Sequence, residues 1–318
     1  MKINKSILKV LVYFGVFNYP VSESEIQFFL DQTIGKKELQ EALEQLVNDQ
    51  YIFKLGEFYS LINDPCLAER RIKGNARAQI QLAIASGIGR FLFRFPYVRG
   101  IAISGSLSKN FADENSDFDF FIITKANRLW IARTIMHLFK KFTYLRKHQH
   151  RYCMNYYLDE EALEIQEKNI FTATELITLL PVRGPEVMHK LFRSNHWATE
   201  YFPQYDKRMM VGVAPAGKNR VKKIIERVFQ NSLGDWLDGY LLRLTTVRWK
   251  QKEVKQLLNI KGNRMGLRTG KHFSKPNPVF FQEKVLTLYQ DKLNETEGKW
   301  NESNFQHIQP FFFKEMIK

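Results

Sequence analysis

The sequence predicts an α+β fold in which a small sheet is surrounded by helices, and three observations support this. Apolar runs of strand length occur at residues 98–103 and 117–123. Apolar residues recur at helical spacing in residues 127–144. Beyond residue 161 the pattern is mostly helical. With 318 residues, of which 44% are hydrophobic and 26 are Phe, the chain can bury a large core and form two or three domains.

The N-terminal part, residues 1–64, is predicted to form a winged helix-turn-helix. Helices are expected at 6–14, at 22–30 with Ser22 as the N-cap, and after Gly35, and a β-hairpin wing is expected at 51–54 and 58–61. The third helix begins with two lysines and continues with acidic and neutral residues, which do not favour phosphate contact. DNA binding and a role in packing, dimerisation or protein contact therefore both stay open.

Two further domains are predicted, at residues 65–213 and 214–318, with Pro65 marking the first linker and residues 214–217 the second boundary. In the second domain we expect a helix at 68–95, strands at 98–103, 117–123 and 151–158, a helix at 127–144 capped by Asn127, and helices at 172–180 and 185–192. In the third we expect helices at 219–229, 234–258 and 279–293 and a flexible, glycine-rich basic loop at 262–275.

The charge of the chain indicates an anionic partner. The formal net charge is +15, and fifteen Lys or Arg lie between Lys218 and Lys275 against four acids. Nucleic acid or a nucleotide fits this excess, and solvated helix faces are the alternative. Cys66 and Cys153 are too far apart to suggest a disulfide framework, and no apolar run reaches the roughly 18 residues of a transmembrane helix. We expect a cytoplasmic protein without membrane association.

Two carboxylates interrupt the apolar run at 117–123. Side chains alternate across a strand, so Asp117 and Asp119 point to one face while Phe118 and Phe120 point to the other. Two like charges among apolar residues repel each other and lose solvation. A divalent metal relieves this cost, and Mg²⁺ commonly takes one or two carboxylates together with substrate phosphates.

A tight turn precedes these acids. The strand at 98–103 ends at Ser104, and Gly105-Ser106 leads into a short helix expected at 107–111. Glycine lets the backbone approach a ligand closely, and the free N–H groups at a helix start attract phosphate. The Ser106 hydroxyl adds a donor and Lys109 a positive charge. A phosphate-binding turn followed by a metal-binding strand is suited to nucleotide transfer from a triphosphate.

Gly105-Ser106, a gap of ten residues, Ser116 and Asp117-Phe118-Asp119 resemble the signature of the DNA polymerase beta-like nucleotidyltransferase superfamily, over about residues 75–160. The resemblance implies a mixed sheet with helices, Mg²⁺ or Mn²⁺ as the metal, and an NTP substrate, for which we expect ATP. It makes Asp117 and Asp119 the catalytic metal ligands, and assigns the nucleotide to Gly105, Ser106, Lys109 and Ser116. The alternative is an exposed turn at 113–116 followed by an edge strand with solvated acids.

One position departs from the pattern. Similar enzymes carry a third carboxylate on a neighbouring strand, where it binds metal and takes the proton of the incoming hydroxyl. Here the middle of that strand holds Asn155, which cannot take a proton at neutral pH, and the nearest acid is Asp159 at the strand's end. Either Asp159 reaches the site, another base serves, or catalysis is weak or absent.

The sequence therefore predicts a metal-dependent nucleotidyltransferase that moves a nucleoside monophosphate from an NTP to a hydroxyl acceptor and releases pyrophosphate. The alternative is a weak or inactive nucleotide-sensing or nucleic-acid-binding regulator that uses the winged helix and the basic C-terminal surface. A further possibility is an interaction scaffold, or one half of a toxin–antitoxin pair. The acceptor and the oligomeric state are not specified by the sequence.

Overall fold

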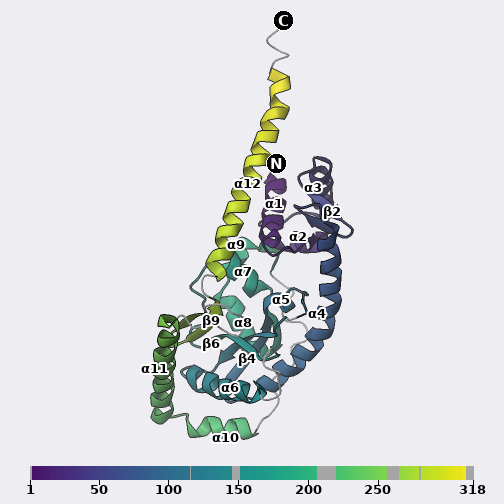
Figure 1. Ribbon diagram of the computed structural model, residues 1–318. Coiled ribbons are helices and arrows are strands. Elements are labelled where there is room, and N and C mark those ends of the chain that lie inside the picture. The colour runs from purple at the N-terminus through teal and green to yellow at the C-terminus, as the bar shows by residue number, and fades with distance from the viewer. Residues whose placement is uncertain are drawn as a thin grey trace. The chain divides into compact units, whose positions relative to one another are not determined.

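A computed structural model describes residues 2–114, 116–144, 151–205, 220–255, 265–278 and 281–312 (Figure 1). The chain forms two compact units, each assembled from separated segments. The first unit comprises Met1–Ile72, Thr199–Asp206 and Gln282–Lys318, and the second comprises Lys73–Ala198 and Lys207–Phe281. In the described part of the chain, no helix is both long and apolar enough to cross a membrane.

The first unit combines helices with a small antiparallel sheet whose strand order is β1-β3-β2. Its elements are α1 (Lys2–Gly15), β1 (Val21–Ser22), α2 (Glu23–Phe29), α3 (Lys36–Asn48), β2 (Phe53–Leu55), β3 (Phe58–Ser60), the start of α4 (Pro65–Leu92), η2 (Pro203–Tyr205) and α12 (Phe281–Phe312). The N-cap predicted at Ser22 is confirmed, since its hydroxyl accepts from the Glu25 backbone N–H and the Glu25 carboxylate accepts from the Ser22 N–H. The predicted hairpin is present as β2 and β3.

The second unit is built on a mixed sheet of six strands in the order β7-β4-β5-β6-β9-β8. β5 and β6 are parallel and the other neighbours are antiparallel. The strands are β4 (Val98–Ser104), β5 (Asp119–Thr124), β6 (Cys153–Asp159), β7 (Leu180–Arg183), β8 (Met265–Thr269) and β9 (Phe273–Pro278). β5 lies between β4 and β6, so the alternative of an edge strand with solvated acids is excluded.

Helices pack around this sheet and complete its core. They are the rest of α4, α5 (Gly105–Ser108), α6 (Leu129–Tyr144), α7 (Ile170–Ile177), α8 (Pro185–Ser194), α10 (Arg220–Val228) and α11 (Ser232–Val254). α9 (Ala198–Tyr201) belongs to the first unit from Thr199 on. Phe120 and Ile122 of β5 and Trp130 of α6 are fully buried in one apolar cluster with residues of α4. Burial on this scale makes the sheet the rigid support of the second unit.

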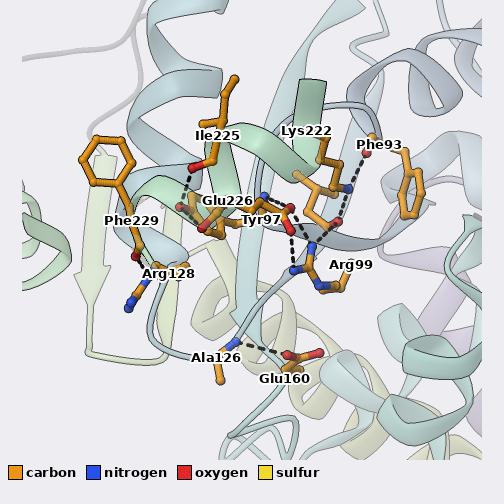
Figure 2. Close-up of polar contacts among 11 residues, drawn as sticks. Phe93, Tyr97, Arg99, Ala126, Arg128, Glu160, Lys222, Ile225, Glu226 and Phe229 are labelled. Atoms are coloured by element: carbon orange, nitrogen blue, oxygen red, sulfur yellow. Dashed lines mark hydrogen bonds and ion pairs between the residues drawn. The ribbon is translucent and has the colours of Figure 1, made fainter. Parts of the chain in front are cut away.

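Polar contacts hold α10 against the second unit (Figure 2). The Glu226 carboxylate accepts two hydrogen bonds of 2.9 Å from the Arg99 guanidinium and one of 2.7 Å from the Tyr97 backbone N–H. Lys222 Nζ donates to the carbonyl oxygens of Phe93 and Val98. Charged side chains of this basic helix are thus used internally, and burial lowers the pKa of Lys222 to about 8.

Several local predictions differ from the structure, and among them Pro65, expected to mark a linker, begins α4. Leu180, expected at the end of a helix, begins β7 because the chain there pairs with β4. The described part of the predicted loop at 262–275 contains β8 and the first half of β9, because Phe273 and Ser274 pair with β6 on the side away from β5. Asn127 does not cap α6: it has a φ of +57° and lies two residues before the helix begins.

The two units also differ from the predicted division into residues 1–64, 65–213 and 214–318. The region after 214 is shared between the units, because β8 and β9 extend the sheet of the second unit while α12 packs in the first, where the rings of Tyr13 and Tyr289 are 5.8 Å apart. The predicted boundary at 214–217 lies outside the described residues.

Candidate functional site

Of the predicted site residues, Gly105, Asp119 and Asn155 lie at one end of the sheet of the second unit, and Asp159 does not. β4 ends at Ser104, which pairs with Asp119 at the start of β5, and Asp119 in turn pairs with Cys153 at the start of β6. Because β4 is antiparallel to β5 while β6 is parallel to it, these three strand ends lie side by side. The turn after β4 and the acids before and within β5 therefore meet at the same end of the sheet.

Gly105 makes this meeting possible. Its φ is +71°, a backbone conformation that residues with a Cβ rarely adopt, and a Cβ built there would lie 2.4 Å from Oδ2 of Asp119. No other residue type fits between the turn and the carboxylate without moving one of them. The exposed Ser106 follows directly, at the start of α5. The turn thus brings its backbone close to the Asp119 carboxylate. A ligand bound by both the backbone and the carboxylate requires this closeness.

Asp117 and Asp119 lie on the less buried side of the segment that enters the sheet. The regular strand begins at Asp119, two residues later than predicted, yet the alternation already holds: Phe118 and Phe120 are buried while both aspartates are partly exposed. The Phe118 carbonyl accepts from the Cys153 N–H at 3.1 Å, which extends the pairing towards Asp117. The two carboxylates are therefore presented to the same side of the sheet.

The pKa of the Cys153 thiol is affected by both Asp117 and Asp119. Burial raises its pKa to about 12, and the negative charges of Asp119 and Asp117 act in the same direction, while Lys140 opposes them. A thiol with this pKa stays protonated at neutral pH. The effect also places both carboxylates within electrostatic reach of one atom at the start of β6.

Asn155 occupies the position at which a third carboxylate was expected. Its Nδ2 donates to Oδ1 of Asp119 at 2.5 Å, and its Oδ1 accepts from the Cys153 thiol at 3.0 Å. The amide therefore orients Asp119 and adds no negative charge. It cannot act as a base, because a neutral amide does not take a proton at neutral pH.

Asp159 lies at the opposite end of β6, where it pairs with Thr124, and so does not reach Asp119. Its carboxylate is fully buried and lies 2.8 Å from Nδ1 of His272. It also accepts from the backbone N–H groups of Asn127 and Glu161. Ligand atoms of Asp159, Glu161 and His272 lie within 4.8 Å of one another, a spacing that could hold a metal ion. Sequence reasoning missed His272, which no motif marks.

The remaining predicted residues have partners within the protein. Lys109 Nζ donates to Glu175 of α7 at 2.7 Å and to the Gly105 carbonyl at 3.2 Å, so its charge lies beside the turn but is shared with an acid. The Ser116 hydroxyl accepts from the Asp113 N–H at 2.8 Å and shapes the loop before the acids. The sequence offered no signal for Glu175, since the pairing joins residues that are far apart in the chain.

Comparison with known proteins supports a chemical class. Residues 86–177 match the family model of the nucleotidyltransferase domain. The match begins within α4 and ends with α7, so it includes the turn at Gly105, both aspartates and Asn155. A comparison with curated proteins and one with solved structures found no match. Nucleotidyl transfer is the chemistry that this part of the chain supports.

Proposed function

We propose that the protein is a metal-dependent nucleotidyltransferase, which moves a nucleoside monophosphate from an NTP to a hydroxyl acceptor and releases pyrophosphate. The observation that carries the proposal is the contact of the Gly105 turn with Asp119 inside the region that matches the nucleotidyltransferase domain. Such a contact supports the proposal because it would let backbone amides and a carboxylate bind one ligand, as a metal-bound triphosphate requires.

The residues present fit a divalent metal. Asp117 and Asp119 offer hard oxygen ligands at one end of the sheet, and Asn155 holds Asp119 in place. Mg²⁺ or Mn²⁺ bound there supplies charge neutralisation for the triphosphate and for the attacking and leaving oxygens. The amides of Gly105 and Ser106 then face the terminal phosphates, and we expect ATP as the NTP.

Proton transfer is the weak part of this site. Neither Asn155 nor the Cys153 thiol, with its pKa of about 12, takes a proton from an acceptor hydroxyl at neutral pH. Lys109 must leave Glu175 before it can bind a phosphate. Because neither residue beside Asp119 on β6 serves as the base, we expect a slow chemical step.

The test is incubation of the full chain with each α-labelled NTP and Mg²⁺ or Mn²⁺, with added RNA as one acceptor. We expect pyrophosphate release and a labelled product with the unmodified chain, and neither with Asp119→Asn. Asp49→Asn is the matched control, because Asp49 is an exposed carboxylate in the first unit. Equal turnover in Asp117→Asn, Asp119→Asn and the control excludes the assignment.

A second candidate is a nucleotide-binding regulator without turnover, and Asn155 favours it because it replaces the expected base. The discriminating variant is Asn155→Asp. If the unmodified chain binds a labelled NTP with Mg²⁺ but releases no pyrophosphate, while Asn155→Asp gains release, the site is a binding site that lacks its base. Turnover in the unmodified chain that Asn155→Asp does not increase favours the enzyme.

For the first unit we propose a winged helix that contacts protein. The order of three helices and three strands before α4 supports a winged helix. α3 exposes Glu38, Glu41 and Glu44, and these carboxylates repel a phosphate backbone. Gel-shift titration of duplex DNA at low salt tests this. Binding that is lost in Lys36→Ala/Lys37→Ala supports DNA recognition instead.

A nucleic-acid partner is proposed for the basic C-terminal region. Of the four acids between Lys218 and Lys275, Glu226 binds Arg99, Asp235 binds Arg128 and Asp238 accepts from the Ile131 N–H. Glu167, outside this range, binds Arg268 and Lys275. The proposal therefore rests on the excess of fifteen basic residues over four acids in this range. RNA binding that weakens steeply with salt supports this partner, and binding that salt leaves unchanged contradicts it.

A further inference from the structure

Helix α11 is apolar on two opposite faces, and the described residues pack against only one of them. On the inner face Leu237, Leu241 and Leu242 pack against the two apolar clusters of the second unit. Asp238, also on this face, accepts from the Ile131 N–H of α6 at 2.9 Å. The inner face alone therefore accounts for the attachment of α11 to its own unit.

The outer face carries a second apolar stripe, which we name the α11 seam: Leu233, Trp236, Tyr240, Arg243 and Val247. Its four apolar members are 55%, 64%, 49% and 54% exposed in that order. The spacing alternates between three and four residues, as at the a and d positions of helices that pack in pairs. A helix with apolar residues on both sides is typical of a layer between two others. In the described part of the chain, no second layer packs against the seam.

We propose that the seam packs against the same seam of a second copy of this chain, as an antiparallel pair of helices related by a two-fold axis at Tyr240. In this register Leu233 faces Val247 of the other copy, Trp236 faces Arg243, and Tyr240 faces Tyr240. The first two contacts each occur twice and the Tyr240–Tyr240 contact occurs once, on the axis, as a closed two-fold interface requires. The seam is therefore complementary to a second copy of itself.

The position of Arg243 selects this arrangement. In a parallel pair Arg243 meets Arg243, and two positive charges repel each other. In the antiparallel pair the guanidinium lies against an indole face, which attracts cations. Trp236 is already oriented for this contact, because it stacks on Tyr240 of its own helix with ring centroids 5.6 Å apart and an angle of 8° between the rings.

The same residues argue against other occupants. A bilayer surface does not favour an arginine between Tyr240 and Val247 in the middle of the apolar stripe. A nucleic acid has no partner for the aliphatic ends, Leu233 and Val247, of the stripe. The second copy satisfies the aliphatic, aromatic and charged members together.

The helix itself offers a matched control. α11 spans Ser232–Val254, so an antiparallel pair centred on Tyr240 overlaps only over about residues 232–248. Val254 continues the stripe by seven residues and is 83% exposed, but it lies beyond the overlap. A charge at Val254 therefore changes the same face of the same helix without entering the interface.

The first experiment measures molecular mass by sedimentation at micromolar concentration. We expect the unmodified chain and Val254→Glu to be dimers, and Trp236→Glu to be a monomer with unchanged circular dichroism and melting temperature. Dimers that all three chains form equally, or monomers in all three, overturn the proposal. So does Trp236-dependent pelleting with anionic vesicles, or Trp236-dependent RNA binding, by a monomeric chain.

The second experiment tests the register by disulfide trapping in a Cys66→Ser background, since Cys66 is exposed. Tyr240→Cys alone is expected to form a covalent dimer under mild oxidation because it lies on the axis. Leu233→Cys alone and Val247→Cys alone are not, whereas a mixture of these two variants is. Covalent dimers from each single variant indicate a parallel pair and overturn the antiparallel assignment.

Discussion

Two carboxylates at opposite ends of the same pair of strands have different surroundings. Asp119, at the start of β5, is partly exposed and lies against the Gly105 backbone and a neutral amide. Asp159, at the end of β6, is fully buried and is surrounded by His272 and two backbone N–H groups. The first lies at the proposed nucleotide site, and the second joins β6 to the β8–β9 hairpin and to the loop before α6. The neighbours of a carboxylate therefore decide its role more than the strand that carries it.

The strongest test of the different roles of Asp119 and Asp159 is the variant Asp119→Asn. We expect pyrophosphate release to fall by at least about 100-fold, because a direct metal ligand exceeds the 10–100-fold typical of supporting residues. The melting temperature should change little, since Asp119 is partly exposed. Activity and thermal unfolding of the same preparation measure both. A large loss of stability with activity per folded molecule retained reverses the assigned roles.

Asp159→Ala should show the opposite pattern. It removes the acceptor of His272 and of the N–H groups of Asn127 and Glu161, residues that are themselves partly exposed or exposed. Because a hydrogen bond to a charged group contributes about 1.5–3 kcal/mol, we expect a loss of that size in the free energy of unfolding. Urea unfolding measures it. Glu164→Gln, an exposed acid beyond β6, is the control, and a loss no larger than in this control contradicts the structural role.

Gly105→Ala tests the role of the turn that lies against Asp119. The added Cβ meets Oδ2 of Asp119 at 2.4 Å, and the φ of +71° costs roughly 1–2 kcal/mol for alanine. We expect about a tenfold loss of pyrophosphate release, since 1.4 kcal/mol corresponds to a factor of ten. Gly239→Ala in α11, where a Cβ meets nothing within 4 Å, is the control. Equal activity in the two variants shows that the conformation of the Gly105 turn does not affect the reaction.

The smallest expected effect is on Cys153. Because burial and then the charge of Asp119 raise the pKa of this thiol, iodoacetamide at pH 8 should modify it more slowly than the exposed Cys66. Asp119→Asn removes a negative charge, lowers the pKa of the Cys153 thiol and should speed its modification. Mass spectrometry of the two cysteine peptides follows both rates. An unchanged Cys153 rate in Asp119→Asn shows that the carboxylate does not act on this strand end.

Much of the proposed site around Asp119 was predictable from local sequence. Gly105, Ser106, Asp117 and Asp119 stand within fifteen residues, and a glycine turn and alternating burial depend on near neighbours. The contact of Asn155 with Asp119 required the parallel pairing of β5 and β6. The pairs Lys109–Glu175 and Asp159–His272 join residues 66 and 113 positions apart, and no periodicity reports such contacts.

The sequence by itself determined where the chain turns before the acids, which residues of β5 alternate between the core and the more exposed face, and that a glycine precedes the acids, because these properties arise within one strand or turn. Only the tertiary structure decided that Asp159 lies at the other end of β6 from Asp119, that residues 265–278 extend the sheet, and that the described residues leave the apolar seam of α11 exposed. These depend on which distant segments pack together, and packing is set by the shape and burial of the whole unit.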